Sequence, residues 1–210
     1  MSKLFNIPPS RPWQLNSQSE LCVADIDGDG RDEVVILDQA KLALGVLSYF
    51  KYGDLSDQWE QVENDQLICI QMSQAIVPDA SGTGGWQLFS TDRIIDANLD
   101  GDKTSEIVIF APHDSYIGVL KSNGTELQTK WMLKGTVPGA GQTQGWTLSP
   151  TDQLYRADFD GEDGDVIVIH NPEARFIGVL KWDGSELQTL WKVSGTVPAT
   201  GGAQGWALTA

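Results

Sequence analysis

Short apolar runs, separated by turns rich in Gly, Asp and Pro, predict a succession of β-strands along this chain. The clearest series predicts strands at 154–159, 166–170, 176–181 and 186–193. These runs are rich in β-branched and aromatic residues and are too short for long helices. Asn123-Gly124 and Asp183-Gly184 stand between such runs, and these dipeptides favour the tight turns of β-hairpins. The pattern predicts an all-β protein with no helix of consequence.

The pattern repeats about every 60 residues. Trp86, Trp146 and Trp206 each stand in Gly-Trp-x-Leu, and the segments that begin at Trp86 and Trp146 are identical at 29 of 60 positions without a gap. A more diverged copy begins at Pro12-Trp13-Gln14-Leu15 and carries 13 extra residues. An internal duplication of this kind indicates a repeat fold. We divide the single repeat domain, 1–210, into repeat 1 (13–85, with its insertion at about 49–62), repeat 2 (86–145), repeat 3 (146–205) and a C-terminal closing strand (206–210).

An acidic loop follows the first predicted strand of each repeat. In repeat 1, Asp25, Asp27 and Asp29 stand at alternate positions between glycines, and Glu33 occupies the ninth position. Carboxylates so spaced suit calcium, which takes six to eight oxygen ligands, and the glycines let the chain curl around an ion. An EF-hand requires Glu at the twelfth position, where this chain has Ile36 inside a strand-like run. The sequence therefore predicts a calcium site between two strands, with an acidic solvated turn as the alternative.

These loops and their spacing resemble the FG-GAP or VCBS-type repeats of integrin-α-like β-propellers and of some propeller lectins. The resemblance implies blades of four strands, with calcium in an Asp-x-Asp-x-Asp-Gly-x-x-Asp/Glu loop between the first two. It implies these ligands: Asp25, Asp27, Asp29, the Arg31 carbonyl and Glu33 in repeat 1; Asn98, Asp100, Asp102, Thr104 and Glu106 in repeat 2; and Asp158, Asp160, Glu162 and Asp165 in repeat 3. Repeat 2 departs from the pattern at Lys103 and Thr104, and repeat 3 has Val166 in place of the ninth-position acid.

The number of blades raises the question of how such a fold would close. Three β-propeller type blades of about 60 residues are fewer than the four or more of closed propellers, and Gly205-Trp206-Ala207-Leu208 begins a fourth copy. We expect a homodimer that completes six blades, because exposed sheet edges invite pairing. An unusual three-fold closed β fold within one chain and a fragment of a longer chain are the alternatives.

Trp86, Trp146 and Trp206 are candidate ligand-binding residues. Aromatic faces stack on the C–H faces of sugars, and loops of Gly, Thr, Gln and Ala precede these tryptophans; packing between blades is the alternative role. The interpretation is a calcium-stabilised, lectin-like repeat protein that binds a carbohydrate or glycoprotein at several sites. The second hypothesis is an integrin-α-like adhesion or assembly module that binds proteins through the aromatic insertion of repeat 1.

Charge and composition narrow the function classes further. The formal net charge of −15 argues against nucleic acid and against an anionic membrane surface as partners, because both require a basic footprint. No leader and no apolar run of membrane-spanning length is recognised, which predicts a soluble protein; the compartment stays open, and an extracellular one reached by a non-classical route is included. His113 and His170 stand in no catalytic motif, so no enzyme is predicted. Cys22 and Cys69 are expected as separate buried thiols.

Overall fold

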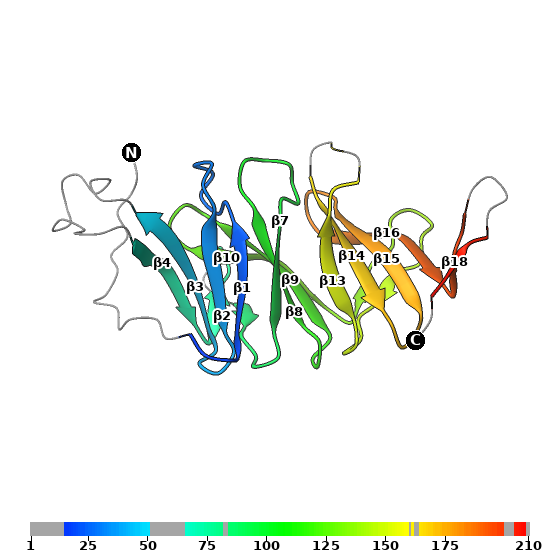
Figure 1. The fold of residues 1–210 in the computed structure, drawn as a ribbon, viewed down its shortest axis with the longest axis horizontal. Coiled ribbons are helices and arrows are strands. Elements are labelled where there is room, and N and C mark those ends of the chain that lie inside the picture. Colours follow the sequence, from blue (N-terminus) through cyan, green and yellow to red (C-terminus); the bar gives the residue numbers. More distant parts are fainter. Residues whose placement is uncertain are drawn as a thin grey trace.

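Three antiparallel sheets of four strands, one for each repeat, lie side by side in chain order (Figure 1). The computed structural model describes residues 15–50, 66–81, 84–159, 161, 164–199 and 204–208. The all-β prediction is confirmed for these residues, among which there is no helix. Sheet 1 contains β1 (Ser19–Ala24), β2 (Glu33–Asp38), β3 (Ala43–Phe50) and β4 (Gln66–Gln74); sheet 2 contains β7 (Arg93–Ala97), β8 (Glu106–Ala111), β9 (Tyr116–Ser122) and β10 (Leu127–Lys134); sheet 3 contains β13 (Gln153–Ala157), β14 (Val166–Asn171), β15 (Phe176–Trp182) and β16 (Leu187–Ser194).

Each sheet is followed by a short two-stranded hairpin, where the sequence pattern predicted only a loop. We call these the connecting hairpins: β5 (Ile76–Pro78) with β6 (Gly85–Gln87), β11 (Thr136–Val137) with β12 (Trp146–Thr147), and β17 (Thr196–Val197) with β18 (Trp206–Ala207). Each pairs a valine with the tryptophan of Gly-Trp-x-Leu. Trp13, most of the repeat 1 insertion and the last residues of the predicted closing strand lie outside the described residues.

Local sequence explains the strand order within each sheet. Gly124 and Gly184 turn the third strand into the fourth with φ of +82° and +101°, which glycine adopts without steric cost. In both turns the preceding Asn123 or Asp183 accepts backbone N–H groups through its side chain. The pairing of the third and fourth strands shifts by one residue in all three sheets. The repeated sequence thus produces a repeated sheet down to its bulge.

The core consists of two apolar layers, one between sheets 1 and 2 and one between sheets 2 and 3. β8 shows the principle, because all six of its residues are buried. Ile107 and Ile109 point into the first layer, whereas Val108 and Phe110 point into the second, as the alternation of a strand requires. Trp86 lies in the first layer and Trp146 in the second. The connecting hairpins therefore place one tryptophan at each junction between sheets.

This arrangement brings the three acidic loops to one edge of the row. Loop 1 (25–32), loop 2 (98–105) and loop 3 (158–165) each follow the first strand of a sheet, and these strands lie next to one another, β1 beside β7 and β7 beside β13 (Figure 1). The described part of the chain offers no helix of the length and apolar character that a membrane span requires. Cys22 and Cys69 are free thiols, and both are half-buried rather than buried as the sequence predicted.

Candidate metal sites and the tryptophan junctions

The acidic loops are joined in series by backbone hydrogen bonds. The N–H of Ser105 in loop 2 donates to the carbonyl of Asp25 in loop 1 at 2.7 Å, and the N–H of Asp165 in loop 3 donates to the carbonyl of Asn98 in loop 2 at 2.6 Å. The added Cβ of an alanine at position 28 would lie 3.1 Å from the side chain of Thr104. The loops therefore pack on each other as the sheets do.

Loop 1 gathers the acids that the sequence singled out. Asp25, Asp27 and Asp29 each offer one carboxylate oxygen, and these oxygens lie within 4.8 Å of one another. The loop curls through Gly28 and Gly30, with φ of +77° and +85°, and both N–H groups donate to Asp25. The loop is thus preformed by its own backbone, and its three carboxylates could hold a metal ion. Arg31, whose carbonyl the resemblance implies as a ligand, donates its N–H to Asp29 Oδ1 at 2.8 Å.

Glu33 lies at the base of loop 1. Its side chain is 2% exposed, and Oε2 accepts the N–H of Ile26 at 2.9 Å while the Ser48 hydroxyl lies 3.4 Å from Oε1. Burial, reinforced by the nearby carboxylates of Asp27, Asp29 and Asp25, raises the pKa of Glu33 to about 7. A buried acid next to three other carboxylates carries its charge at a cost that a cation would offset.

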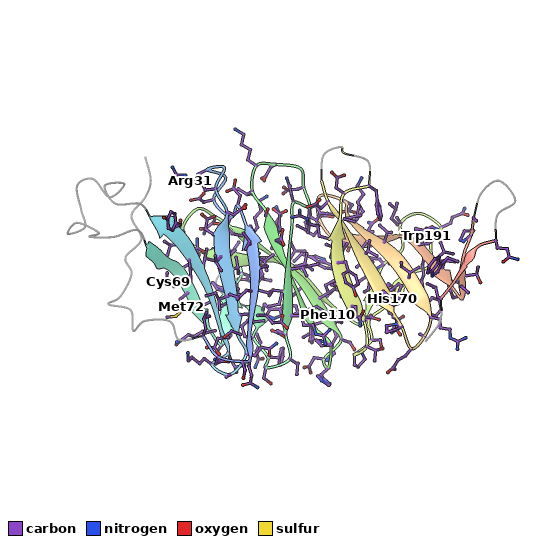
Figure 2. All side chains as sticks on the ribbon, viewed as in Figure 1. Arg31, Cys69, Met72, Phe110, His170 and Trp191 are labelled. Atoms are coloured by element: carbon purple, nitrogen blue, oxygen red, sulfur yellow. The ribbon has the colours of Figure 1, made fainter. Side chains whose placement is uncertain are left out.

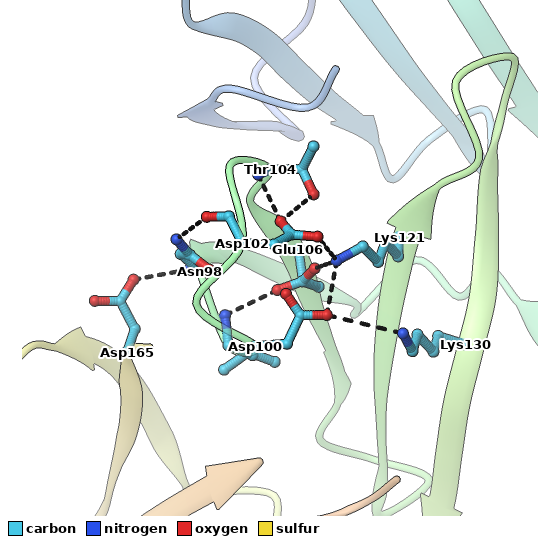
Figure 3. Close-up of polar contacts among 9 residues, drawn as sticks. Asn98, Asp100, Asp102, Thr104, Glu106, Lys121, Lys130 and Asp165 are labelled. Atoms are coloured by element: carbon cyan, nitrogen blue, oxygen red, sulfur yellow. Dashed lines mark hydrogen bonds and ion pairs between the residues drawn. The ribbon is translucent and has the colours of Figure 1, made fainter. Parts of the chain in front are cut away.

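Loop 2 has a similar set of acids but holds a cation of its own. Asp100, Asp102 and Glu106 offer oxygens within 4.8 Å of one another. The ammonium of Lys121, on β9, lies 2.7 Å from Asp100 Oδ2, 2.8 Å from Asp102 Oδ2 and 2.6 Å from Glu106 Oε1 (Figure 3). Glu106 is 2% exposed, and its Oε2 accepts the N–H of Leu99 at 2.8 Å. Lys121 therefore lies where the three carboxylates converge.

The electrostatics of loop 2 follow from this lysine. Burial alone would raise the pKa of Asp102, but hydrogen bonds from Lys121 and Thr104 outweigh it and lower that pKa to about 2. Burial would lower the pKa of Lys121, but its hydrogen bonds to the three carboxylates raise it. Thr104 donates both its N–H and its hydroxyl to Asp102 Oδ1. Asn98 Nδ2 donates to the carbonyl of Asp102 at 2.8 Å.

Loop 3 is described only in part, and its described residues form no acidic cluster like those of loops 1 and 2. Asp160 and Glu162 lie outside the described residues, and Asp158 is exposed and accepts the N–H of Gly161. The carboxylate of Asp165 accepts the N–H of Asn98 in repeat 2 at 2.8 Å. The same carboxylate lies 3.7 Å from the guanidinium of Arg156 in its own repeat. The carboxylate of Asp165 therefore joins neighbouring loops; its metal-binding role stays a prediction, because Asp160 and Glu162 lie outside the described residues.

Trp86 and Trp146 belong to the junctions between sheets. Each is 2% exposed, and each ring N–H donates at 2.8 Å to a fully buried aspartate, Asp92 or Asp152. An added Cβ at Gly118 would lie 2.6 Å from the ring of Trp86, so the indole packs directly on the strand backbone. Both indoles are buried at the junctions between sheets, which is the packing role that the sequence analysis left open as the alternative; ligand binding by these two residues stays a prediction.

Trp206 is the third member of the set and differs sharply from the other two. Its side chain is 77% exposed, although its hairpin has the same pairing, Val197 opposite Trp206. No described sheet follows β18, so the surface on which Trp86 and Trp146 pack has no counterpart for Trp206 within the described residues. Figure 2 shows Trp191 on sheet 3 close to this last hairpin, and Trp191 is itself 37% exposed.

Two buried threonines that sequence reasoning missed hold the hairpins in place. Thr129 Oγ1 accepts the N–H of Trp86 at 2.8 Å and donates to the carbonyl of Val77 at 2.9 Å. Thr189 makes the same two bonds to Trp146 and Val137, at 2.9 and 3.3 Å. The identity of these threonines and of Asp92 and Asp152 between repeats 2 and 3 was a signal in the sequence. What the threonines contact was not, because their tryptophan partners lie 43 residues away in the chain.

Comparisons with protein-family models, with curated proteins and with solved structures found no match for this chain.

Proposed function

We propose that the protein is a calcium-stabilised β-repeat module that assembles with a second copy of itself through the open face of sheet 3. The single observation that carries the proposal is the contrast between Trp206 and its counterparts Trp86 and Trp146, 77% against 2% exposed. Within the described residues, the tryptophans of the first two hairpins, Trp86 and Trp146, are covered by the sheet that follows. A second copy supplies the missing sheet, so that three blades of each chain form one propeller-type ring of six.

The open face extends beyond the hairpin. In repeat 2, Leu99 and Ile117 face sheet 3 and are 4% and 0% exposed. Their counterparts in repeat 3, Phe159 and Ile177, are 67% exposed and half-buried. A surface with the composition of an intrachain junction but without its cover is typical of an interface. The open face of sheet 3 has the same kind of apolar residues as the face of sheet 2 that packs on sheet 3. This likeness supports another sheet of the same kind as the partner of the open face.

The opposite end of the row offers a matching apolar strand. Leu21 and Val23 on β1 are 53% and 51% exposed, and Tyr155 on β13 is 51% exposed. The first strand of each sheet lies beside the first strand of the next, β1 beside β7 and β7 beside β13. Continuing the row in the same way places β13 of one copy beside β1 of the second copy. The contact is head-to-tail, and two such contacts close a ring with two-fold symmetry.

Calcium is proposed as the stabilising ion of the acidic edge. Loop 1 offers three carboxylates at a site preformed by backbone hydrogen bonds, and hard oxygen ligands with several negative charges favour calcium over softer metals. A bound ion stabilises the folded state in proportion to its affinity and concentration. Removal of calcium with EDTA should therefore lower the melting temperature, and an unchanged melting temperature would contradict this part of the proposal.

Lysine substitutions on the open face test the assembly. Trp206→Lys and Phe159→Lys place a charge where the second copy would pack, and we expect sedimentation velocity to show a shift from dimer to monomer. Leu190→Lys is the matched control, because Leu190 is exposed at 48% and its repeat 2 counterpart is already a lysine, Lys130. Dissociation by all three variants, or by none, would count against the open face as the interface.

Carbohydrate recognition is a second candidate function, supported by a hollow rather than by the buried tryptophans. The hollow has a volume of about 310 Å³ and is lined on β7 and β13 by side chains that include Arg93, Gln153 and Tyr155, with Glu20 of β1. An aromatic ring among charged and amide groups suits a hydroxyl-rich ligand. A glycan array in calcium should show hits that Tyr155→Ala removes; an array without hits would dismiss the sugar. The second hypothesis, protein binding through the insertion of repeat 1, concerns residues that lie outside the described part of the chain, apart from the first two residues of the insertion.

A further inference from the structure

We propose that Lys121 is a built-in cation that takes the place of a metal ion at loop 2, so that of loops 1 and 2 only loop 1 binds calcium. The inference rests on the calcium binding proposed above and goes beyond it by assigning different cations to two related loops. It also assigns a function to Ser48, the residue at the equivalent position of repeat 1.

The equivalence of Ser48 and Lys121 is fixed by strand register. Each follows Gly-Val-Leu of its repeat, and Leu47 pairs with Val34 on β2 as Leu120 pairs with Ile107 on β8. Each residue therefore lies next to the buried glutamate of its loop: Ser48 Oγ is 3.4 Å from Glu33 Oε1, and Lys121 Nζ is 2.6 Å from Glu106 Oε1. One position on the third strand decides what faces the acids.

At loop 2 this position leaves no room for a metal ion. All three donors of an ammonium group can be used at once, and Lys121 Nζ has three carboxylate oxygens between 2.6 and 2.8 Å away. Calcium would need the same oxygens at about 2.3–2.6 Å, so it would have to displace the ammonium. Lys130 adds a second positive charge 3.8 Å from Asp100 Oδ2. Figure 3 shows both lysines pointing at the loop from the neighbouring strands.

At loop 1 the same position is a neutral serine. Asp25, Asp27 and Asp29 offer carboxylate oxygens within 4.8 Å of one another, and Ser48, which lies next to the buried carboxylate of Glu33, brings no charge to them. Two like charges about 4 Å apart repel by roughly 1 kcal/mol in water and by about 4 kcal/mol at a protein surface. The acids of loop 2 converge on the ammonium of Lys121. The loop 1 cluster differs in containing Asp25 rather than the buried glutamate, and with serine in place of the lysine it obtains its cation from solution.

The two positions can be exchanged in the full-length protein. We expect native mass spectrometry in calcium to count one ion fewer per chain for Ser48→Lys than for the wild type, and one ion more for Lys121→Ser. The double variant Ser48→Lys/Lys121→Ser should return to the wild-type count, with the ion of loop 1 now at loop 2. Lys181→Ser, at the exposed equivalent position of repeat 3, is the matched control and should leave the wild-type count unchanged.

The outcomes separate this inference from the calcium proposal. No gain of an ion in Lys121→Ser would overturn the role of Lys121 while calcium binding stood. No ion on the wild type or on any variant would overturn calcium binding itself. If Lys121→Ser fails to fold without metal, circular dichroism during a calcium titration becomes the readout: folding restored by calcium supports the inference, and a chain that stays unfolded in calcium contradicts it. Thermal melts add a readout, since Ser48→Lys should lose its sensitivity to EDTA.

Discussion

Thr129→Val tests how the connecting hairpins hold neighbouring repeats together. The substitution replaces a hydroxyl by a methyl group of similar volume and keeps the β-branched shape that suits a strand. It removes two hydrogen bonds of Thr129, which is 6% exposed: the bond from the N–H of Trp86 and the bond to the carbonyl of Val77. The strand itself should therefore survive while the hairpin loses its attachment to β10.

The expected cost follows from the groups left unpaired. A net hydrogen bond contributes about 1 kcal/mol, and a buried donor without a partner costs about 1–3 kcal/mol. The N–H of Trp86 would be such a donor, because its bond to Thr129 is buried, and the methyl group gains a little apolar burial in return. We expect Thr129→Val to lower the free energy of unfolding by about 2–4 kcal/mol.

Urea denaturation followed by tryptophan fluorescence, at one protein concentration, measures this cost. Thr189→Val should lose a similar amount, because Thr189 makes the same bonds at 2.9 and 3.3 Å. Thr136→Val is the control, since the hydroxyl of Thr136 is exposed and contacts only Thr147 Oγ1 at 3.2 Å; it should change stability by less than about 0.5 kcal/mol. A Thr129→Val variant as stable as this control would refute the role given to the hydroxyl.

Two further substitutions test the junction between sheets 1 and 2. Burial raises the pKa of Asp92 to about 6, although the hydrogen bonds from Trp86 and Phe89 lower it. The folded state therefore favours the protonated carboxyl. The stability that this preference contributes is fully present below the unfolded pKa of about 4 and is lost as the pH rises through 6. Asp92→Asn should therefore gain up to about 3 kcal/mol relative to the wild type between pH 4 and pH 7, measured by urea denaturation at both pH values; a constant difference would contradict the buried charge. Gly118→Ala should destabilise by about 1–3 kcal/mol through overpacking, because its Cβ would lie 2.6 Å from the Trp86 ring; a thermal melt equal to that of Ser90→Ala, at an exposed position, would contradict the contact.

The strands and acidic loops could be predicted because their signals are local. Apolar runs bounded by Asn123-Gly124 and Asp183-Gly184 predicted the four strands of sheet 3 to within a few residues. The 60-residue repeat then extended that prediction to the other sheets. The spacing of acids in loop 1, and the resemblance that extended it to loop 2, named the carboxylates that the structure brings together.

The roles of single side chains depended on contacts that local patterns do not carry. Trp86 and Trp206 share one motif, yet one is sealed between sheets and the other is exposed, because burial depends on whether a sheet follows. Lys121 belongs to β9 and reaches a loop about 20 residues earlier in the chain, so spacing within the loop could not reveal it. Asp165 turned to the preceding repeat for the same reason.

Native mass spectrometry of the full-length protein in calcium tests the account most directly, because it counts chains and ions together. The account predicts a complex of two chains that carries calcium, with one ion at loop 1 of each chain. A single chain at micromolar concentration would contradict assembly through the open face of sheet 3, and a complex without calcium would contradict the metal-stabilised edge.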